Sequence, residues 1–249
     1  MLTEERLQAI EQLIREKGSV SNIELMDELN ISESTVRRDL TILDDQGRIN
    51  KVRGGAMIRS DCYNSQEATM TQKKDLNIQE KTVIAKYASS LIEPGDFVFL
   101  DAGSTTELMI DHLNEKNVTF VTNAVSHAKK LSEAGYTTYI LGGEFKATTE
   151  AIVGDETIDS LQKYNFTKGF FGANGIHERV GITTPDVKEA AVKKEALKHC
   201  MKKFVLCDPS KFSQISSVKF AQMEQVKILT TMFADDKYDS YDNIIKLKI

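Results

Sequence analysis

The chain has 249 residues, of which 41% are hydrophobic and 28% charged, and its formal net charge at pH 7 is -5. These values are ordinary for a globular protein and allow a small domain beside a larger one. The negative charge excludes nucleic-acid binding over most of the surface, and no apolar run approaches membrane-spanning length, so we expect no membrane partner.

The first predicted helix covers residues 3–17. Leu7, Ile10 and Ile14 repeat there at helical spacing, and Gly18 is a typical helix end. This N-terminal stretch also contains acids and no long apolar segment. We therefore expect no signal peptide and a cytoplasmic protein.

A second predicted helix begins after Ser21, because Ser21 and Glu24 form a capping-box pattern ahead of Leu25. Asn30 is a suitable C-terminal stop, and Ser32 can cap a third helix. Two helices separated by so few residues predict a helix-turn-helix.

The third predicted helix, residues 33–43, has two different faces. Val36, Leu40 and Leu43 form an apolar stripe that requires a core. A DNA major groove admits such a helix, and its first side chains then reach base edges and phosphates. A surface helix with solvated arginines shows the same pattern, so the neighbouring segments decide between the two. The polar face carries Ser34, Thr35, Arg37, Arg38 and Thr41.

The segment after this helix is short and basic. Gly47 stops the helix, residues 48–53 can run extended, and the pair Gly54-Gly55 turns the chain. Two strands around a basic turn form a wing, so Lys51 and Arg53 join the predicted DNA-binding residues. Residues 1–57 nevertheless hold eight Arg or Lys against eleven Asp or Glu. We therefore expect a modest and strongly salt-dependent affinity for DNA.

The run from Thr35 to Leu40, followed by Gly47 and the triplet 54–56, resembles the winged helix-turn-helix of the DeoR family of bacterial repressors. Motif order and spacing match together. The family often has histidine before the double glycine, whereas this chain has Arg53. A phosphate contact is expected there, but no histidine role is carried over.

The rest of the chain divides into a predicted linker and a predicted α/β domain. Residues 58–78 are polar and aperiodic, and we expect a linker there. From residue 79 to 249, apolar runs alternate with helical patterns, which predicts an α/β domain with a mostly parallel sheet. The expected strands lie near 97–100, 118–122, 137–141, 169–172, 203–207, 226–230 and 244–248.

Ligands of such sheets bind at the carboxyl ends of the strands, where this chain has small and polar loops. The sharpest runs from Leu100 to Glu107, with Gly103 at the turn and Ser104 opening a helix. Backbone N–H groups at a helix start bind phosphate. A plain capping box between Ser104 and Glu107 is the alternative. Loops at Asn123, 142–143, 172–175 and 208–211 leave further room for a small polar molecule.

These loops also resemble the sensor domain of the DeoR family, whose fold is similar to that of ribose-5-phosphate isomerase. The family effectors are phosphorylated sugars or their relatives. The resemblance implies that Ser104, Thr105 and Thr106 bind phosphate, together with the Gly103 backbone. It implies positive charge from Lys193 and Lys211, although Glu189 and Lys193 can also be an ordinary surface pair. Sugar hydroxyls are assigned to Asp101, Asn123, Asn174 and Glu189.

The stretches 181–189 and 216–221 look most like the fructose operon repressors, which makes fructose 1-phosphate the first effector to consider. The chain is then a repressor of a sugar-utilisation operon that binds double-stranded operator DNA. A sugar-phosphate isomerase or deaminase is the alternative from another class, with Asp101 and Glu189 as proton carriers. A protein-interaction domain joined to a metabolite-binding domain is a third reading.

Three further expectations concern assembly, thiols and metals. One recognition helix reads only a few base pairs, so a homo-oligomer, dimer or tetramer, is expected. Cys62, Cys200 and Cys207 share no CxxC spacing, and we expect reduced thiols. The four histidines show no metal spacing either, so no metal site and no cofactor are expected.

Overall fold

The computed structural model describes residues 3–17, 19–46, 48–52, 54–58, 69–233 and 236–248. The chain forms two compact units, Met1–Cys62 and Tyr63–Ile249. The first is called the N-terminal unit below and the second the α/β unit. Gly18, Gly47, Arg53 and Cys62, which carried predictions above, lie outside the described residues.

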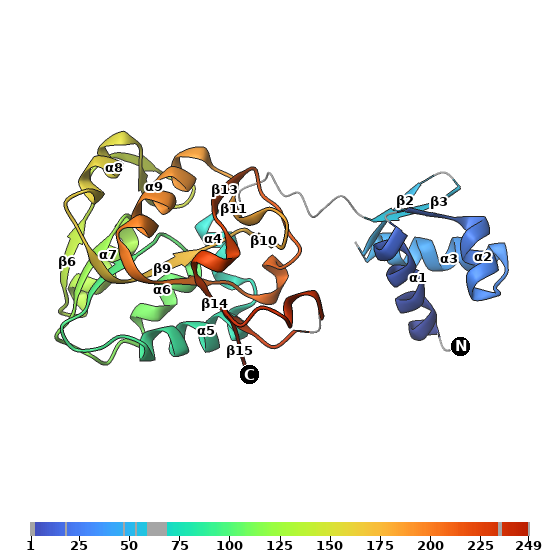
Figure 1. Ribbon diagram of the computed structural model, residues 1–249, viewed down its shortest axis with the longest axis horizontal. Coiled ribbons are helices and arrows are strands. Elements are labelled where there is room, and N and C mark those ends of the chain that lie inside the picture. Colours follow the sequence, from blue (N-terminus) through green and yellow to red (C-terminus); the bar gives the residue numbers. More distant parts are fainter. Residues whose placement is uncertain are drawn as a thin grey trace. The chain divides into compact units, whose positions relative to one another are not determined.

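The N-terminal unit packs helices onto a small antiparallel sheet in which β3 lies between β1 and β2 (Figure 1). Its core contains the predicted stripe, because Val36, Leu40 and Leu43 are fully buried or nearly so. The strand β1 was not predicted. The elements are α1 (Thr3–Lys17), β1 (Ser19–Ser21), α2 (Asn22–Leu29), α3 (Glu33–Asp45), β2 (Ile49–Val52) and β3 (Gly55–Ile58).

The predicted caps set the turn between α2 and α3. Ser21 and Glu24 form the complete capping box, with the Glu24 N–H donating to Ser21 Oγ at 3.2 Å. Asn30 ends α2 in the left-handed conformation, with φ 51°, and Ser32 Oγ accepts from the N–H of Thr35. The helix-turn-helix therefore arises from local hydrogen bonds that can be identified in the sequence.

The double glycine has a steric role in this sheet. Gly54 has φ +89°, a conformation that favours glycine. A Cβ on Gly55 would lie 2.3 Å from the carbonyl oxygen of Val20. Since real Cβ atoms do not approach oxygen so closely, only glycine lets β1 pair with β3 at this position.

The α/β unit is built on a seven-stranded sheet in which every pairing is parallel. The strand order is β15-β14-β12-β9-β4-β5-β6. This agrees with the predicted α/β class and with the seven predicted strands. Their bounds are β4 (Phe97–Leu100), β5 (Thr119–Thr122), β6 (Thr137–Ile140), β9 (Phe166–Gly172), β12 (Cys200–Leu206), β14 (Lys227–Thr231) and β15 (Ile244–Leu247).

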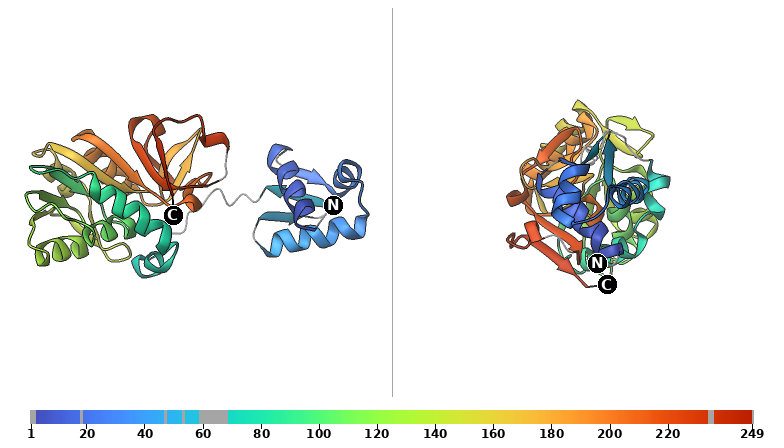
Figure 2. Two further views of the ribbon diagram at one scale, coloured as in Figure 1. Left: turned by 90° about the horizontal axis from the view of Figure 1, so that it is seen from below. Right: turned by 90° about the vertical axis from the view of Figure 1, so that its right-hand side faces the viewer.

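Helices and smaller strands cover both faces of the sheet (Figures 1 and 2). Neighbouring strand residues alternate between two cores, as Phe170 and Phe171 do. One face packs against α5 (Ile78–Ser90), α6 (Ser104–Ile110) and α7 (Val125–Glu133). The other packs against α8 (Asp155–Leu161) and α9 (Val187–Lys198).

Small strands that the sequence analysis did not anticipate complete the second face. They form one three-stranded and one two-stranded sheet. β11 pairs with both β10 and β13, and the N–H of Ser216 donates to Thr183 Oγ1 at 2.8 Å. The two stretches that resembled fructose operon repressors are thus adjacent in space. The bounds are β7 (Glu144–Lys146), β8 (Ala151–Val153), β10 (Gly175–His177), β11 (Gly181–Thr184) and β13 (Val218–Ala221).

The expectation of an aperiodic linker is wrong for residues 69–78. A helix, α4 (Met70–Asp75), forms there, and α5 begins at Ile78. Thr69 and Gln72 make a capping box that a search for longer periodic patterns overlooks, and Met70 is buried in the α/β unit. Because only one apolar side chain anchors this helix, hydrophobic periodicity could not reveal it.

Candidate functional site

The polar face of α3 is exposed, as the helix pattern predicted. Ser34, Arg37, Arg38 and Thr41 are exposed, and Thr35 is half-buried. The Arg37 guanidinium lies 2.6 Å from Glu33 Oε1, an exposed pair one helical turn apart that costs little to exchange for a phosphate. The side chain of Arg38 is 67% exposed and lies 4.0 Å from Asp39. Both arginines are thus accessible to an anionic partner.

The strand β2 places Lys51 against the exposed face of α3. Lys51 Nζ donates to Thr41 Oγ1 at 2.6 Å, and its backbone N–H donates to Asp44 at 3.1 Å. The structure therefore joins the predicted wing residue Lys51 to the predicted helix residue Thr41. Arg53 lies outside the described residues.

Arg48, which belongs to the basic segment after α3, has a structural role. Its guanidinium contacts Glu11 at 2.6 Å and Glu4 at 3.4 Å, with a quarter of the side chain exposed. These contacts tie the start of the wing to α1. The charge of Arg48 is therefore compensated within the N-terminal unit, and the exposed described cations of the polar face are Arg37, Arg38 and Lys51.

The α/β unit has a cavity of about 200 Å³ at the carboxyl ends of three adjacent strands, β4, β9 and β12. The chain leaves β4 toward β5 on one side and later returns with β9 on the other side. Such a point of reversal is where parallel sheets bind ligands. The cavity is lined by Met70, Lys73, Leu76, Asn77, Lys81, Ala102, Gly103, Ser104, Thr105, Thr149, Gly172, Ala173, Asn174, Glu189, Lys193, Leu206, Cys207, Asp208 and Lys211.

Ser104 and Thr105 open α6 at the wall of this cavity. Both are buried from bulk water, and within the described residues neither hydroxyl has a hydrogen-bond partner. Thr106 differs, because its Oγ1 donates to the carbonyl of Asp101 at 2.7 Å and lies 3.2 Å from His127 Nε2. Thr106 does not line the cavity. Ser104 and Thr105 therefore line the cavity, whereas the Thr106 hydroxyl holds the loop in place.

Asp101 lies below the cavity and does not line it. Its Oδ2 accepts from the N–H of Gly172 at 2.9 Å and forms a very short ion pair with Lys193 Nζ. Burial raises the pKa of Asp101, and the charge of Lys193 opposes that rise. Asp101 thus joins the loop after β4 to the loop after β9 and positions Lys193 in the cavity wall.

Glu189 and Lys193 are not an ordinary surface pair, because both are buried at the cavity. Thr149 Oγ1 donates to Glu189 Oε1 at 2.5 Å, and Lys146 Nζ lies 3.1 Å from the same oxygen. Burial raises the pKa of Glu189, but Lys193, Thr149 and Lys146 together bring it below its ordinary value. Glu189 therefore gives the cavity wall a charged carboxylate.

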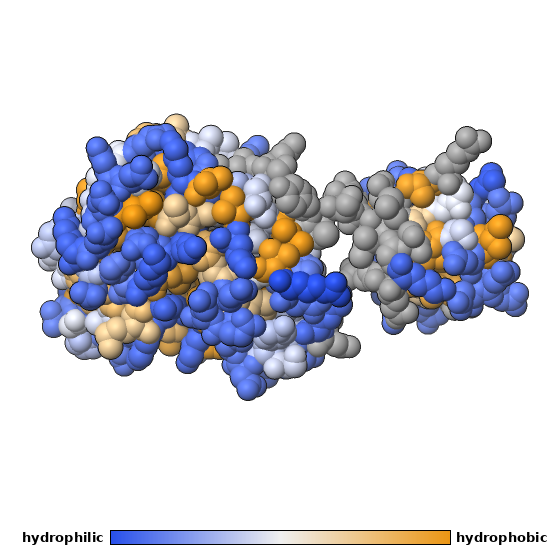
Figure 3. Space-filling view, turned by 45° about the horizontal axis from the view of Figure 1, so that its top comes forward, coloured by the Kyte–Doolittle hydropathy of each residue, from blue (hydrophilic) through white to orange (hydrophobic). Residues whose placement is uncertain are grey.

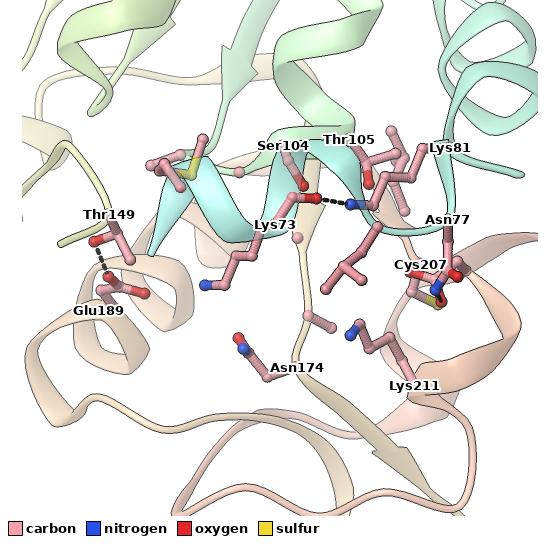
Figure 4. A pocket seen from close by; sticks show the side chains of 18 of the residues that line it. Lys73, Asn77, Lys81, Ser104, Thr105, Thr149, Asn174, Glu189, Cys207 and Lys211 are labelled. Carbon is pink, nitrogen blue, oxygen red and sulfur yellow. Dashed lines mark hydrogen bonds between the residues drawn. The ribbon is translucent and has the colours of Figure 1, made fainter. Parts of the chain in front are cut away.

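The remaining predicted residues separate into two groups. Asn174 and Lys211 line the cavity (Figure 4). Asn174 Oδ1 accepts from Thr184 Oγ1 at 3.2 Å. Asn123 does not line it. Its Oδ1 accepts from the N–H of Ala102 at 3.1 Å, and its Nδ2 donates to the carbonyl of Ile152. Asn123 follows β5, which lies one strand away from the point where the strand order reverses. Its side chain therefore holds the loop after β4 without reaching the cavity.

Sequence reasoning missed the wall that α4 and α5 provide. Lys73, Asn77 and Lys81 all line the cavity. Lys81 is 4% exposed, and its Nζ donates to the carbonyl oxygen of Lys73. Burial lowers the pKa of Lys81, nearby Lys211 and Lys73 add to that effect, and Asp208 opposes it. The signal that could have found this wall was the Thr69–Gln72 capping-box spacing within the supposed linker.

The other candidate groups are structural. His127 is fully buried, and burial lowers its pKa to about 3, so the ring is neutral. Cys200 and Cys207 are free and buried. In the part of the chain that the structure covers, no cluster of His, Cys, Asp or Glu is arranged to hold a metal ion. None of the described helices has the length and apolarity needed to cross a membrane.

Comparisons with known proteins match both units. The model of the DeoR-like helix-turn-helix domain matches residues 6–61, and that of the DeoR C terminal sensor domain matches residues 76–232. The chain is 40% identical to an uncharacterized HTH-type transcriptional regulator FruR of Bacillus subtilis, covering 100% of this chain and 99% of that protein.

More distant relatives and solved structures were also found. The lactose phosphotransferase system repressor of Streptococcus mutans is 34% identical over 98% of this chain and 100% of its own length. Ribose 5-phosphate isomerase A of Methanocaldococcus jannaschii has a similar structure, with a TM-score of 0.40 and 18% identity over 55% of each chain.

Proposed function

The chain belongs to the DeoR family of transcriptional regulators, and we propose that it represses a sugar-utilisation operon under the control of a phosphorylated sugar. The N-terminal unit binds double-stranded operator DNA in this proposal. The cavity of the α/β unit binds the effector. Full-length relatives at 34–40% identity are regulators, and the chain is a regulator rather than an enzyme.

The observation that carries the proposal is the concentration of cations at the cavity. Lys73, Lys81 and Lys211 reach it from three elements, and Figure 4 shows Lys73 and Lys211 extending into the same space. Burial lowers the pKa of Lys81 and the charges of Lys211 and Lys73 add to this effect, so a bound anion would stabilise its charged form. A phosphate group fits this requirement, because it offers several strong acceptor oxygens to ammonium groups.

The end of the cavity away from Lys81 and Lys211 suits sugar hydroxyls (Figure 4). Glu189 and Thr149 lie there, and Asn174 supplies an amide group (Figure 4). A charged carboxylate accepts hydrogen bonds from hydroxyls and repels a second phosphate. We assign phosphate to Ser104, Thr105 and the backbone at Gly103, and hydroxyls to Asn174 and Glu189. Three predicted residues do not line the cavity but hold its loops and Lys193 in place: Asp101, Thr106 and Asn123.

Fructose 1-phosphate is the proposed effector. The relative with 40% identity is named FruR, and several relatives with 34% identity are named lactose phosphotransferase system repressors. The lactose repressor names support a sugar-related ligand, whereas the choice of fructose rests on the sequence stretches that resemble fructose operon repressors. The stretches 181–189 and 216–221, which suggested fructose in the sequence, meet through β11 and β13 beside the cavity. This neighbourhood is a reasonable place for sugar selectivity.

Operator recognition is assigned to α3 and the wing. Arg37, Arg38, Lys51 and Arg53 contact phosphates in this proposal, and Thr41 supports Lys51. Ser34 and Thr35 lie at the start of α3, where side chains reach base edges. The protein acts on DNA and would therefore work in the cytoplasm of a bacterium.

A homo-oligomer, dimer or tetramer, is proposed as the working form. One recognition helix covers only a short half-site, so paired helices are needed for selectivity. The α/β unit has apolar side chains available for an interface: Tyr139 and Ile140 on the edge strand β6 are each 49% exposed, and Phe145 is 52% exposed. Figure 3 shows that apolar residues reach the surface in patches among hydrophilic ones.

Calorimetric titration of fructose 1-phosphate, with and without operator DNA, tests the proposal. Linkage requires operator to change effector affinity by the same factor by which effector changes operator affinity. We expect different effector affinities in the two titrations, and a panel of other hexose monophosphates serves for comparison. Equal affinities for every compound would refute effector control of DNA binding.

A further inference from the structure

The helix α4 is too short to be stable by itself. It has six residues, and isolated helices of that length do not persist in water. Its only buried side chain is Met70. Lys73 is half-buried, and the other residues of α4 are exposed. The order of α4 must therefore come from its contacts with the rest of the α/β unit.

Those contacts come largely from groups that surround the cavity. The N–H of Met70 donates to the carbonyl of Thr148 at 3.1 Å, next to Thr149, which binds Glu189. Lys81 Nζ donates to the carbonyl of Lys73, a bond drawn in Figure 4. At the exposed side, Lys74 Nζ lies 2.9 Å from Glu107 on α6. A ligand that touches Lys81 or Glu189 therefore touches the supports of α4.

α4 also contributes a side chain to the cavity, and it lies at the start of the described part of the α/β unit. The side chain of Lys73 lines the cavity. Thr69, which caps α4, is the first described residue of the α/β unit, so α4 is the first element that the structure describes in this unit. A change in the order of α4 would therefore occur at the described element of the α/β unit that lies nearest in sequence to the N-terminal unit.

We propose that Lys73 binds the anionic group of the effector and that α4 thereby transmits effector binding to the N-terminal unit. Bound effector orders α4 by joining Lys73 to Lys81 and the Ser104 loop across one anion. Without effector, α4 lacks this anion-mediated contact and is held less firmly against the α/β unit. The inference rests on the proposed function, since it presumes an anionic effector in the cavity.

Two adjacent lysines test the assignment of Lys73. Lys73→Gln removes a cavity cation, whereas Lys74→Gln removes a neighbouring cation of the same helix that does not line the cavity. With fructose 1-phosphate, or the panel compound that binds best, we expect calorimetry to show about tenfold weaker binding for Lys73→Gln. The Lys74→Gln variant should bind within about twofold of the unmodified protein. Unchanged affinity of Lys73→Gln would overturn the assignment.

The double variant Thr69→Ala, Gln72→Ala tests transmission, because it removes the capping box of α4 without altering a cavity-lining residue. Without operator, the double variant should bind the effector within about threefold of the unmodified protein. The coupling factor, by which added operator changes effector affinity, should fall close to one. The matched control is Gln222→Ala, Gln225→Ala, which removes a similar box near β13 and should leave that factor intact.

Hydrogen exchange of residues 70–75 in the unmodified full-length protein gives an independent measurement. Exchange should slow at least about tenfold when the effector is added. Unchanged exchange, or a capping variant that keeps the full coupling factor, would overturn transmission through α4 while leaving effector control itself standing. If operator leaves the effector affinity of the unmodified protein unchanged, the proposed function itself is refuted.

Discussion

The guanidinium of Arg6 on α1 holds the carboxylate of Asp39 on α3, with Nε 2.5 Å from Oδ2 and Nη2 3.2 Å from Oδ1. Asp39 is fully buried, so this two-point contact compensates its charge and fixes the orientation of α3 against α1. The recognition helix is therefore held by a polar contact as well as by its apolar stripe.

Arg6→Met should destabilise the N-terminal unit, because it leaves the buried Asp39 carboxylate without its partner. We expect a melting temperature lower by at least about 5 °C for this unit in calorimetry. Arg37→Met, which removes an exposed guanidinium that pairs with Glu33 on the same helix, is the control and should melt as the unmodified protein does. Equal melting of both variants would contradict the role of Arg6.

Arg38→Ala should weaken binding to all DNA sequences alike, because a phosphate contact carries no sequence information. The slope of log affinity against log salt should fall by about one unit for each phosphate that the protein no longer neutralises. A fluorescence titration over a range of salt concentrations measures both. Ser34→Ala should instead change sequence preference with little change in slope, and an unchanged Arg38→Ala titration would place the docking face elsewhere.

Gly103→Val should abolish effector binding while operator binding survives. Gly103 has φ 176°, which valine adopts readily, so the effect comes from space. A Cβ there lies 3.2 Å from Thr106 Oγ1, and the added methyls project from a residue that lines the cavity. We expect at least about tenfold weaker effector binding by calorimetry. Gly142→Val, at a strand end away from the cavity with nothing within 4 Å, is the control.

Glu189→Gln should relax selectivity between sugar monophosphates and bisphosphates. The Glu189 carboxylate is charged because its pKa lies below its ordinary value, and it faces the end of the cavity away from Lys81 and Lys211 (Figure 4). The unmodified protein should bind fructose 1-phosphate at least about tenfold more tightly than fructose 1,6-bisphosphate, and the variant should narrow this ratio. An unchanged ratio would mean that Glu189 does not select by charge.

His127 should make the α/β unit less stable in acid. Burial lowers its pKa to about 3 in the folded chain, while the unfolded value is near 6.5. The unfolded state therefore binds the proton first, and stability falls as pH decreases from about 6.5 toward 3, by at most about 1.4 kcal/mol per pH unit. Denaturant unfolding of His127→Gln over this range should show a shallower decline, and parallel curves would argue against a neutral buried ring.

Much of the fold could be predicted from the sequence because local chemistry determined it. Caps at Ser21 and Ser32, the stop at Asn30 and the stripe through Val36 are short-range patterns, and each forms as expected. The seven parallel strands were predictable from continuous apolar runs, which mark strands buried on both faces. The additional strands β1, β7, β8 and β10 have three residues each and are too short to give such a signal.

The strand-end loops could be assigned to a ligand from sequence, but the direction of each side chain could not. Ser104 faces the cavity, whereas Thr106, two residues later, turns inward to the Asp101 carbonyl and His127. Likewise, Asn123 follows a strand as Asn174 does, yet it lies one strand away from the reversal. Strand order depends on long-range pairing, which a single sequence does not specify.

The sequence by itself determined the family, the α/β class and the position of small polar loops at the strand ends, because these follow from residue types at short spacing. Tertiary structure alone decided that α4 exists and that Lys73 and Lys81 line the cavity with Lys211. A six-residue helix with one buried side chain is stabilised by contacts with residues far along the chain, such as Thr148. Burial makes Lys81 a perturbed cation rather than a solvated one, and burial is a property of the folded chain.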